Sequence, residues 1–174
     1  MKINLIYAQN EDGAIGLAGP HPLPWHHPED LERFKRLTSG KPMLMGMHTF
    51  DSLPRLLPGR FHYVLTRSPG LPRLGRLDNV QFLNSIDDLV AAAKSNGASE
   101  VFVIGGAGLL NHFIDMGLAD TIYRTVVLNS PLKGNVVRVL KPEDRDPVWK
   151  SYALTQEVDG DGLRFLTYEK IKRS

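Results

Sequence analysis

The chain has 174 residues, of which 42% are hydrophobic and 23% are charged, and it carries a formal net charge of +2. These values are typical of a globular domain rather than of a disordered segment or a coiled coil, and the absence of cysteine excludes disulfides, thiolate nucleophiles and Cys-type zinc sites. The mildly basic balance, with Lys and Arg scattered along the chain, argues against a nucleic-acid-binding protein.

Length and hydropathy favour one soluble domain over residues 1–174. No stretch approaches the roughly 20 apolar residues of a membrane span, and the first apolar run is too short for a secretory signal. We therefore expect a cytoplasmic protein with neither a nucleic-acid nor a membrane partner.

Runs rich in β-forming residues alternate with helical patterns. In chain order, we predict a strand over 3–8, a helix over 28–37, a strand over 42–46 with a short helix after it, strands over 63–66 and 80–83, a helix over 86–95, a strand over 101–104, a helix over 107–116, and strands over 121–128, 151–157 and 164–171. Stretches 16–24 and 68–75, rich in Pro and Gly, are predicted loops inside the domain.

Strands that alternate with helices are typical of a parallel sheet covered on both faces. The last two strands are separated only by DGDG at 159–162, which indicates an antiparallel hairpin. The sequence therefore predicts a single α/β domain: a mostly parallel, eight-stranded mixed sheet with an antiparallel C-terminal hairpin and about four helices on its two faces.

The helix predicted over 28–37 carries one acid on its apolar side. At about 100° per residue, Leu31, Phe34 and Leu37 share that side and Asp30 points between the last two. The other charged residues, Arg33 among them, fall on the opposite arc. Asp30 either stabilises the start of the helix, as first-turn acids do, or binds a planar ligand edge that carries two N–H donors.

Glycine follows two predicted strands at the point where a helix begins, at Gly46 and at Gly105–Gly106. Helix starts present free N–H groups, and glycine allows a phosphate to approach the backbone, so two such turns can hold a pyrophosphate. The alternative is that these glycines only bend the chain. The first strand lacks G-x-G-x-x-G, which excludes an ordinary Rossmann dinucleotide fold.

Other site classes find no support in the sequence. The six histidines show no H-E-x-x-H or other ligand spacing, so we expect no metal site. Neither a P-loop nor a G-x-S-x-G nucleophile elbow is present.

Eight stretches together resemble the dihydrofolate reductase family. They are AIG at 14–16, LPW at 23–25, PEDLERFK at 28–35, KPMLMGMHTFDSL at 41–53, LPGR at 57–60, VLTRSP at 64–69, VIGGAGLL at 103–110 and ADTIYRT at 119–125. The resemblance implies NADPH-dependent reduction of 7,8-dihydrofolate to tetrahydrofolate, with hydride to C6 and a proton to N5, in support of one-carbon and thymidylate metabolism. It also implies a monomer that binds antifolate inhibitors.

The resemblance assigns the substrate site. Asp30 is expected to bind N3 and the 2-amino group of the pterin, with Trp25 and Thr125 holding the water and hydrogen bonds around it. Arg60 is expected to bind the α-carboxylate of the substrate's glutamate, with Arg55 near the same tail. The residues expected to line the pterin and benzoyl rings are Ile6, Leu31, Phe34, Leu53 and Leu57, for which plain core packing is the alternative.

The cofactor site follows from the same resemblance. Ala8, Ile15 and Gly16 are expected near the nicotinamide, and the loop over 16–24 is expected to close over it as a lid. Gly105 and Gly106, which a cis peptide joins in the family, are expected at the pyrophosphate. The remaining expected cofactor contacts are Gly46, Met47, His48, Thr49, Leu65, Thr66, Arg67, Ile104, Ala107, Gly108 and Leu109.

Two departures from the family pattern bear on the cofactor and its lid. Bacterial relatives often carry a basic residue for the adenosine 2′-phosphate where this chain has Met47; we expect Arg67 to supply that charge and to favour NADPH over NADH. Prolines at 20, 22 and 24 predict a stiffer lid.

Two other functions remain open at this point. A reductase of riboflavin biosynthesis also uses NADPH but reduces a ribosylated pyrimidine, and it would need neither Asp30 nor Arg60. The second is a catalytically inert nucleotide-binding module, against which the joint presence of four expected site residues argues: Asp30, Trp25, Thr125 and Arg60.

Overall fold

The structure is a computed structural model that describes residues 1–18, 24–67 and 78–172. Its elements are β1 (Lys2–Asn10), β2 (Ala14–Leu17), α1 (Pro28–Thr38), β3 (Met43–Gly46), α2 (Met47–Ser52), β4 (His62–Leu65), β5 (Val80–Leu83), α3 (Ile86–Ser95), β6 (Glu100–Gly105), α4 (Ala107–Asp115), β7 (Thr121–Val127), β8 (Val136–Arg138), β9 (Tyr152–Asp159) and β10 (Leu163–Lys170). Two short 3-10 helices, η1 (Pro142–Asp144) and η2 (Pro147–Ser151), precede β9.

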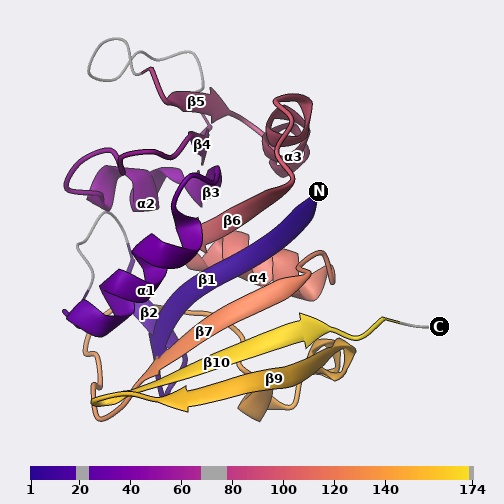
Figure 1. The fold of residues 1–174 in the computed structure, drawn as a ribbon. Coiled ribbons are helices and arrows are strands. Elements are labelled where there is room, and N and C mark those ends of the chain that lie inside the picture. The colour runs from indigo at the N-terminus through magenta and orange to yellow at the C-terminus, as the bar shows by residue number, and fades with distance from the viewer. Residues whose placement is uncertain (19–23, 68–77, 173–174) are drawn as a thin grey trace.

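One eight-stranded sheet forms the centre of the described part, with the order β5-β4-β3-β6-β1-β7-β10-β9 (Figure 1). The pairs from β5 to β7 are parallel, whereas β10 runs antiparallel to both β7 and β9. The predicted mostly parallel sheet with an antiparallel C-terminal hairpin is thereby confirmed. β2 and β8 form a separate two-stranded sheet that was not predicted.

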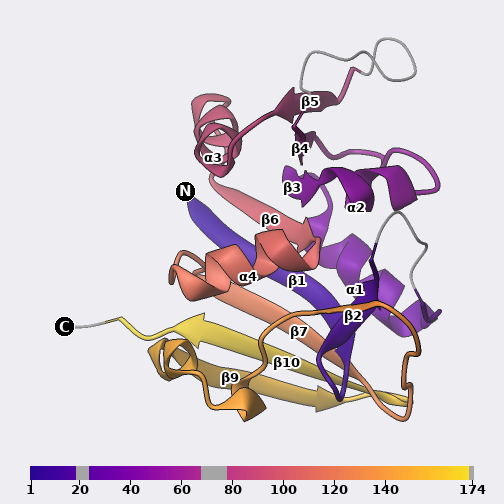
Figure 2. The same ribbon diagram turned by 180° about the vertical axis from the view of Figure 1, so that it is seen from behind.

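Helices cover both faces of the sheet because the side chains of its inner strands alternate between two apolar layers. On β3, Met43 and Met45 pack with partly buried residues of α1 and α2, whereas Leu44 packs in the larger core with residues of α3 and α4. Accordingly, α1 and α2 lie in front of the sheet in Figure 1, and α4 lies in front of it when the molecule is turned round in Figure 2.

The helix that carries Asp30 begins at the predicted residue, Pro28, and ends one residue later than predicted, at Thr38. Pro28 occupies the first helical position, acids lie in the first turn and Lys35 and Arg36 lie in the last, which complements the helix dipole. Leu31, expected on the apolar side, is 40% exposed. None of the described helices is long and apolar enough to cross a membrane.

Much of the two predicted loops lies outside the described residues. Residues 19–23 belong to the predicted lid over 16–24, and residues 68–77 include the second loop. The predicted stiffness of the lid therefore stays a prediction.

Candidate active site

Asp30 contacts a strand rather than the end of its own helix. The hydroxyl of Thr125 on β7 donates a hydrogen bond of 2.7 Å to Oδ1 of Asp30. In the described structure, α1 has His27 at its N-cap and no side-chain capping hydrogen bond. Helix capping therefore does not account for the position of Asp30, although a first-turn carboxylate still suits the helix dipole.

Burial dominates the electrostatics of this carboxyl group. Desolvation raises the pKa of Asp30, while the hydrogen bond from Thr125 and the charges of Arg33 and His27 partly oppose the rise. Because Thr125 is only 2% exposed, it supplies a fixed donor from the sheet. The site thus holds a half-buried carboxylate with acceptor capacity left for a further donor.

Trp25 brings an unused donor to the same region. Its ring packs with Ala8 against a small cluster of Val127, Leu163 and Phe165. Ala8 and Phe165 are both register partners of Thr125 on the neighbouring strands. The indole Nε1 is buried and finds no hydrogen-bond partner among the described residues, which leaves it available for a ligand or a water.

The position of Arg33 corrects the expectation that it lies on the solvent-facing arc of α1. Its guanidinium lies 4.8 Å from the ring centroid of Phe165 and 5.6 Å from that of Tyr123, and Nη2 donates to Thr167 at 3.3 Å. Desolvation lowers the pKa of Arg33, although the charge of Asp30 opposes that shift. At i and i+3 on one helix, Asp30 and Arg33 both turn toward the sheet.

The predicted apolar wall is partly assembled on the α1 face of the sheet. Phe34, Leu53 and Leu57 pack against the buried cluster formed by Met43, Met45 and Val64. Ile6 is 7% exposed on β1. Leu31 does not join these clusters and is exposed. Its exposure is compatible both with contact to a bound ring and with a side chain that faces water.

The two predicted tail-binding arginines differ in their surroundings. Arg55 is exposed. Arg60 is only 6% exposed, its Nη2 reaches the Lys35 carbonyl oxygen at 3.5 Å, and its Nε has no partner among the residues described. Burial lowers the pKa of Arg60. A guanidinium with unused donors is suited to a carboxylate, which it can bind through two parallel hydrogen bonds.

The predicted phosphate-binding glycines meet at one point. A cis peptide joins Gly105 to Gly106, as the resemblance implied. A Cβ on Gly105 would lie 3.0 Å from Thr49 Oγ1, and a Cβ on Gly46 would lie 3.6 Å from the backbone N of Gly106. The starts of α2 and α4 are therefore adjacent, and neither has an acid in its first turn or a side-chain cap within the described chain.

The other expected cofactor residues flank this junction or lie farther out. Ile15 and Gly16 lie on β2, beside β8. Leu109 is 6% exposed and packs in the core, so only its backbone is available to a ligand, whereas a Cβ added to Gly108 would meet no described atom within 4 Å. The rest are placed at strand ends or first helical turns: Met47, His48, Leu65, Thr66, Arg67, Ile104 and Ala107.

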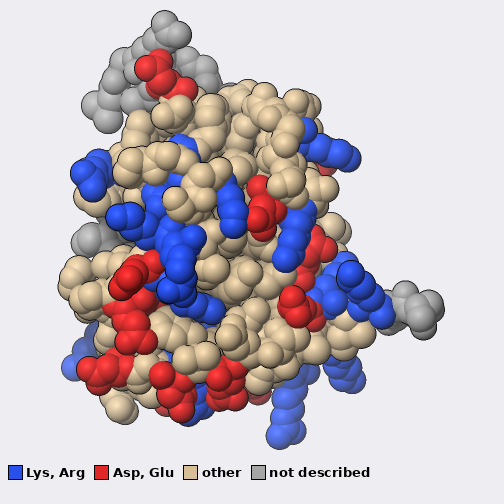
Figure 3. Space-filling view, viewed as in Figure 1, with Lys and Arg blue, Asp and Glu red and all other residues tan. Residues whose placement is uncertain are grey.

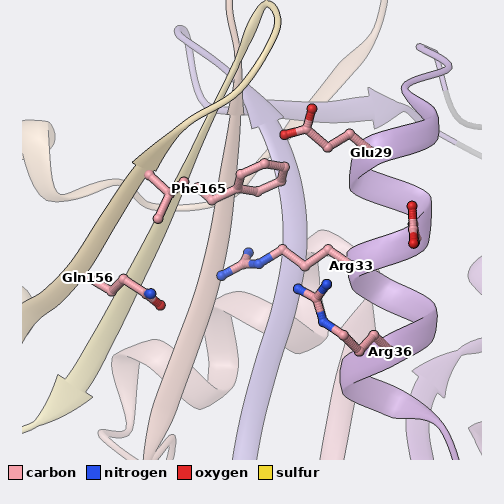
Figure 4. Close-up of a pocket in the computed structure, with 7 residues that line it drawn as sticks. Glu29, Arg33, Arg36, Gln156 and Phe165 are labelled. Carbon is pink, nitrogen blue, oxygen red and sulfur yellow. The ribbon is translucent and has the colours of Figure 1, made fainter.

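A cavity of about 300 Å³ lies next to this region, between α1 and the β9–β10 hairpin. Arg33 and Arg36 point from α1 toward Gln156, and Glu29 and Phe165 lie at the other end (Figure 4). None of the predicted site residues lines this cavity. It is therefore a neighbour of the predicted site and not part of it.

Charge is unevenly distributed over this face. Lys and Arg side chains gather over α1 and α2, while Asp and Glu side chains lie mainly toward the β9–β10 hairpin (Figure 3). A basic surface beside the predicted site favours anionic ligands. The described residues include no group of three or more His, Asp or Glu side chains that could hold a metal ion.

Sequence reasoning missed two buried polar residues. Arg124, 1% exposed, donates to Gln9 Oε1 at 2.5 Å, to the Tyr168 hydroxyl at 3.1 Å and to Glu143 at 3.1 Å. His62 is fully buried at the start of β4. Their partners are separated along the chain by 5 to 115 residues, so only the strand pattern around them gave a signal.

The fold and this arrangement define a class of protein. A mostly parallel sheet with a glycine junction at adjacent helix starts, and a desolvated carboxylate on the neighbouring helix, is typical of a nucleotide-dependent enzyme. The family model for dihydrofolate reductase matches residues 2–170. The chain therefore belongs to the dihydrofolate reductase family.

Individual relatives agree with this assignment. The chain is 34% identical to dihydrofolate reductase HdrB of Haloferax volcanii, with 95% of this chain and 82% of the relative covered. It is 33% identical to dihydrofolate reductase of Bacillus subtilis, over 99% of this chain and 96% of the relative. A solved structure of dihydrofolate reductase from Enterococcus faecalis, complexed with NADP(H) and RAB-propyl, is similar with a TM-score of 0.79, 27% identity and coverage of 98% and 97% of the two chains.

Proposed function

We propose that this protein reduces 7,8-dihydrofolate to 5,6,7,8-tetrahydrofolate with NADPH and thereby supports one-carbon and thymidylate metabolism. The observation that carries the proposal is Asp30, a carboxyl group half-buried on α1 and held by the Thr125 hydroxyl at 2.7 Å. Membership of the family and the named activity of relatives along nearly the whole chain support it.

Asp30 has the chemistry to orient a pterin. Thr125 uses one lone pair of Oδ1, which leaves the rest of the carboxylate for the N3–H and 2-amino group of the pyrimidine edge. Such a forked, charge-assisted pair fixes the plane of the ring. Trp25 Nε1, buried and unpartnered within the described structure, can hold a water beside the ring from which N5 takes its proton.

The glycine junction fits a dinucleotide. Gly105 has a φ of 145°, a backbone conformation that other residues rarely adopt, and a Cβ there would lie 3.0 Å from Thr49 Oγ1. The backbone N–H groups at the start of α4 are not used by any described capping side chain. Residues Gly46, Thr49, Gly105 and Gly106 would hold the pyrophosphate, and Ala8, Ile15 and Gly16 would lie at the nicotinamide. Bound NADPH supplies the hydride that C6 receives.

Arg60 and the apolar wall would bind the rest of the substrate. Phe34, Leu53 and Leu57 are partly buried side chains that pack against one buried cluster and can also pack against the benzoyl ring. The unpartnered Nε of Arg60 leaves donors for the α-carboxylate of the glutamate. We further propose that antifolates occupy this site, that the protein acts as a monomer and that it is cytoplasmic.

An absorbance assay at the nicotinamide band tests the proposal, with NADPH and dihydrofolate as substrates. Asp30→Asn keeps the shape and the Thr125 hydrogen bond but removes the charge, so we expect kcat/KM to fall by about a hundredfold or more. Glu32→Gln, on an exposed position of the same helix, is the matched control and should retain full activity. Equal rates for Asp30→Asn and the unmodified protein would remove Asp30 from the mechanism, and NADPH binding without turnover would favour the inert module.

A second assay addresses the choice of cofactor. Arg67 is exposed two residues after the end of β4, and we propose that it binds the 2′-phosphate of NADPH. Arg67→Ala should raise the KM for NADPH by about ten- to a hundredfold and leave that for NADH unchanged. Lys94→Ala, at the last turn of α3, removes an equal charge as the control. A uniform loss with both cofactors would show that Arg67 does not read the 2′-phosphate.

A further inference from the structure

The segment between α2 and β4, residues 53–61, carries four of the expected substrate contacts, which are Leu53, Arg55, Leu57 and Arg60. It contains no helix or strand, so hydrogen bonds outside the ladder must set its shape. One of these comes from an unexpected group. The backbone N–H of Leu57 donates to Nε2 of His62, at 3.1 Å.

The partners of the two ring nitrogens together fix the protonation state of His62. Nδ1 lies 3.2 Å from the carbonyl oxygen of Asn79, which can only accept, so Nδ1 must carry the proton. Nε2 faces an N–H that can only donate, so Nε2 must be bare. Both contacts are satisfied by the neutral Nδ1–H tautomer and by no other form of the ring.

We propose that neutral His62 is a positioning residue that holds the segment from Leu57 to Arg60 in the shape that receives the substrate's glutamate tail, and that protonation of the ring releases this segment. A proton on Nε2 would set two N–H groups against each other in a site that is fully buried. The inference rests on the proposed function, because it assigns Arg60 to the tail.

The surroundings of the ring favour its neutral form. Phe50 of α2 packs edge-on against the His62 ring, with the two ring centroids 6.3 Å apart. The register partners of His62 on β3 and β5 are the apolar residues Met43 and Val80. Burial lowers the pKa of His62, hydrogen bonding to the backbone of Asn79 and of Arg60 opposes this shift, and the charge of Arg60 adds to it.

Three other charged side chains belong to the segments around the ring: Asp51 on α2, Arg55 in the loop and Asp78 before β5. They do not reverse the net shift. Since the folded-state pKa is lowered, the unfolded or opened segment binds the proton more readily. The closed segment is therefore fully stable above about pH 6.5 and loses stability as the pH falls below that value.

Two readouts test the proposal. Nitrogen chemical shifts of the imidazole in the labelled, ligand-free protein should show the Nδ1–H tautomer at neutral pH, and the Leu57 amide signal should move as the ring is protonated. In assays from about pH 4 to 8, the preference for dihydrofolate over dihydropteroate, which lacks the glutamate, should fall as the ring titrates. Using this ratio removes any effect of pH on Asp30, which both substrates share.

Matched variants separate positioning from folding. His62→Gln keeps a donor and an acceptor but does not titrate, so its tail preference should be independent of pH. His62→Leu leaves the Leu57 N–H unpaired and should lower the preference by roughly three- to tenfold at every pH, through KM with kcat unchanged. In the Arg60→Ala background, the same substitution should have no further effect.

Each contrary outcome is distinct. An Nε2–H tautomer, or protonation that leaves the Leu57 amide and the tail preference unchanged, would overturn the role of His62 even in an active enzyme. Absence of any turnover with dihydrofolate would overturn the proposed function, while the tautomer measurement would still decide whether His62 holds the segment.

Discussion

Thr125 and Asp30 lie 95 residues apart in the chain and are joined by a hydrogen bond of 2.7 Å in which the Thr125 hydroxyl donates. The strand fixes the donor, because Thr125 lies in the middle of β7 between β1 and β10. The helix fixes the acceptor. The geometry of the carboxylate therefore depends on how α1 packs on the sheet.

Replacement of this donor should change the pH profile of the enzyme. Thr125→Val keeps the shape of the side chain but removes an influence that lowers the pKa of Asp30, so that pKa should rise further. We expect the acid limb of kcat/KM to move to higher pH and activity at neutral pH to fall by about tenfold or more. Thr121→Val, equally buried on the same strand, is the control, and identical profiles for the two variants would contradict the prediction.

The raised pKa of Asp30 also predicts an effect on stability. The folded state holds the proton of Asp30 more tightly than the unfolded chain, so ionised Asp30 destabilises the protein above its folded pKa, and this cost vanishes below about pH 4. Urea unfolding of Asp30→Asn should show a gain in stability at neutral pH that disappears near pH 4. A variant that is less stable at neutral pH would show that the charge contributes favourably.

Substitution by alanine should have different effects at two glycines near the start of α4, Gly105 and Gly108. Gly105→Ala places a Cβ 3.0 Å from Thr49 Oγ1 and should weaken NADPH binding, as measured by titration calorimetry. A Cβ in Gly108→Ala would lie on an exposed helical position with no described atom outside its own helix within 4 Å, and the substitution should stabilise the protein by up to about 1 kcal/mol. Unchanged NADPH affinity in Gly105→Ala would contradict the proposed pyrophosphate site.

The buried Arg124 should depend strongly on its acidic partner. Burial favours the neutral form, but Tyr168, Tyr7 and Glu143 outweigh it and raise the pKa of Arg124, so the guanidinium stays charged. Glu143→Gln should cost roughly 1–2 kcal/mol in urea unfolding, less than a fully buried pair because Glu143 is 60% exposed. In the Arg124→Leu background the same substitution should cost nothing, and an equal cost in both backgrounds would exclude the pair.

The large sheet was predictable because its strands are short, apolar and rich in β-branched residues, and because helices separate most of them. β2 and β8 were not, since AIGL and VVR are only four and three residues long and contain no alternating pattern. Their pairing brings Ala14 opposite Arg138, a contact across more than a hundred residues that no local pattern reports.

The candidate site was predictable where a local pattern broke. Asp30 stood out because the helical period put a charge on the apolar side. The same period placed Arg33 wrongly, since its long side chain bends back over Phe165 and Tyr123 and is thereby partly buried. His62 and Arg124 lie inside ordinary strand sequences, and their partners come from other elements.

The alternation of β7 has a consequence for how its length can vary in evolution. Thr125 faces Asp30, and the adjacent Arg124 faces Gln9 and Tyr168 on the other side of the sheet. A single inserted or deleted residue before this pair would rotate the strand by one pleat, bury a cation beside the proposed folate site and turn the threonine into the opposite core. Insertions in this lineage should therefore accumulate in the connections on either side of β7 and spare the strand itself.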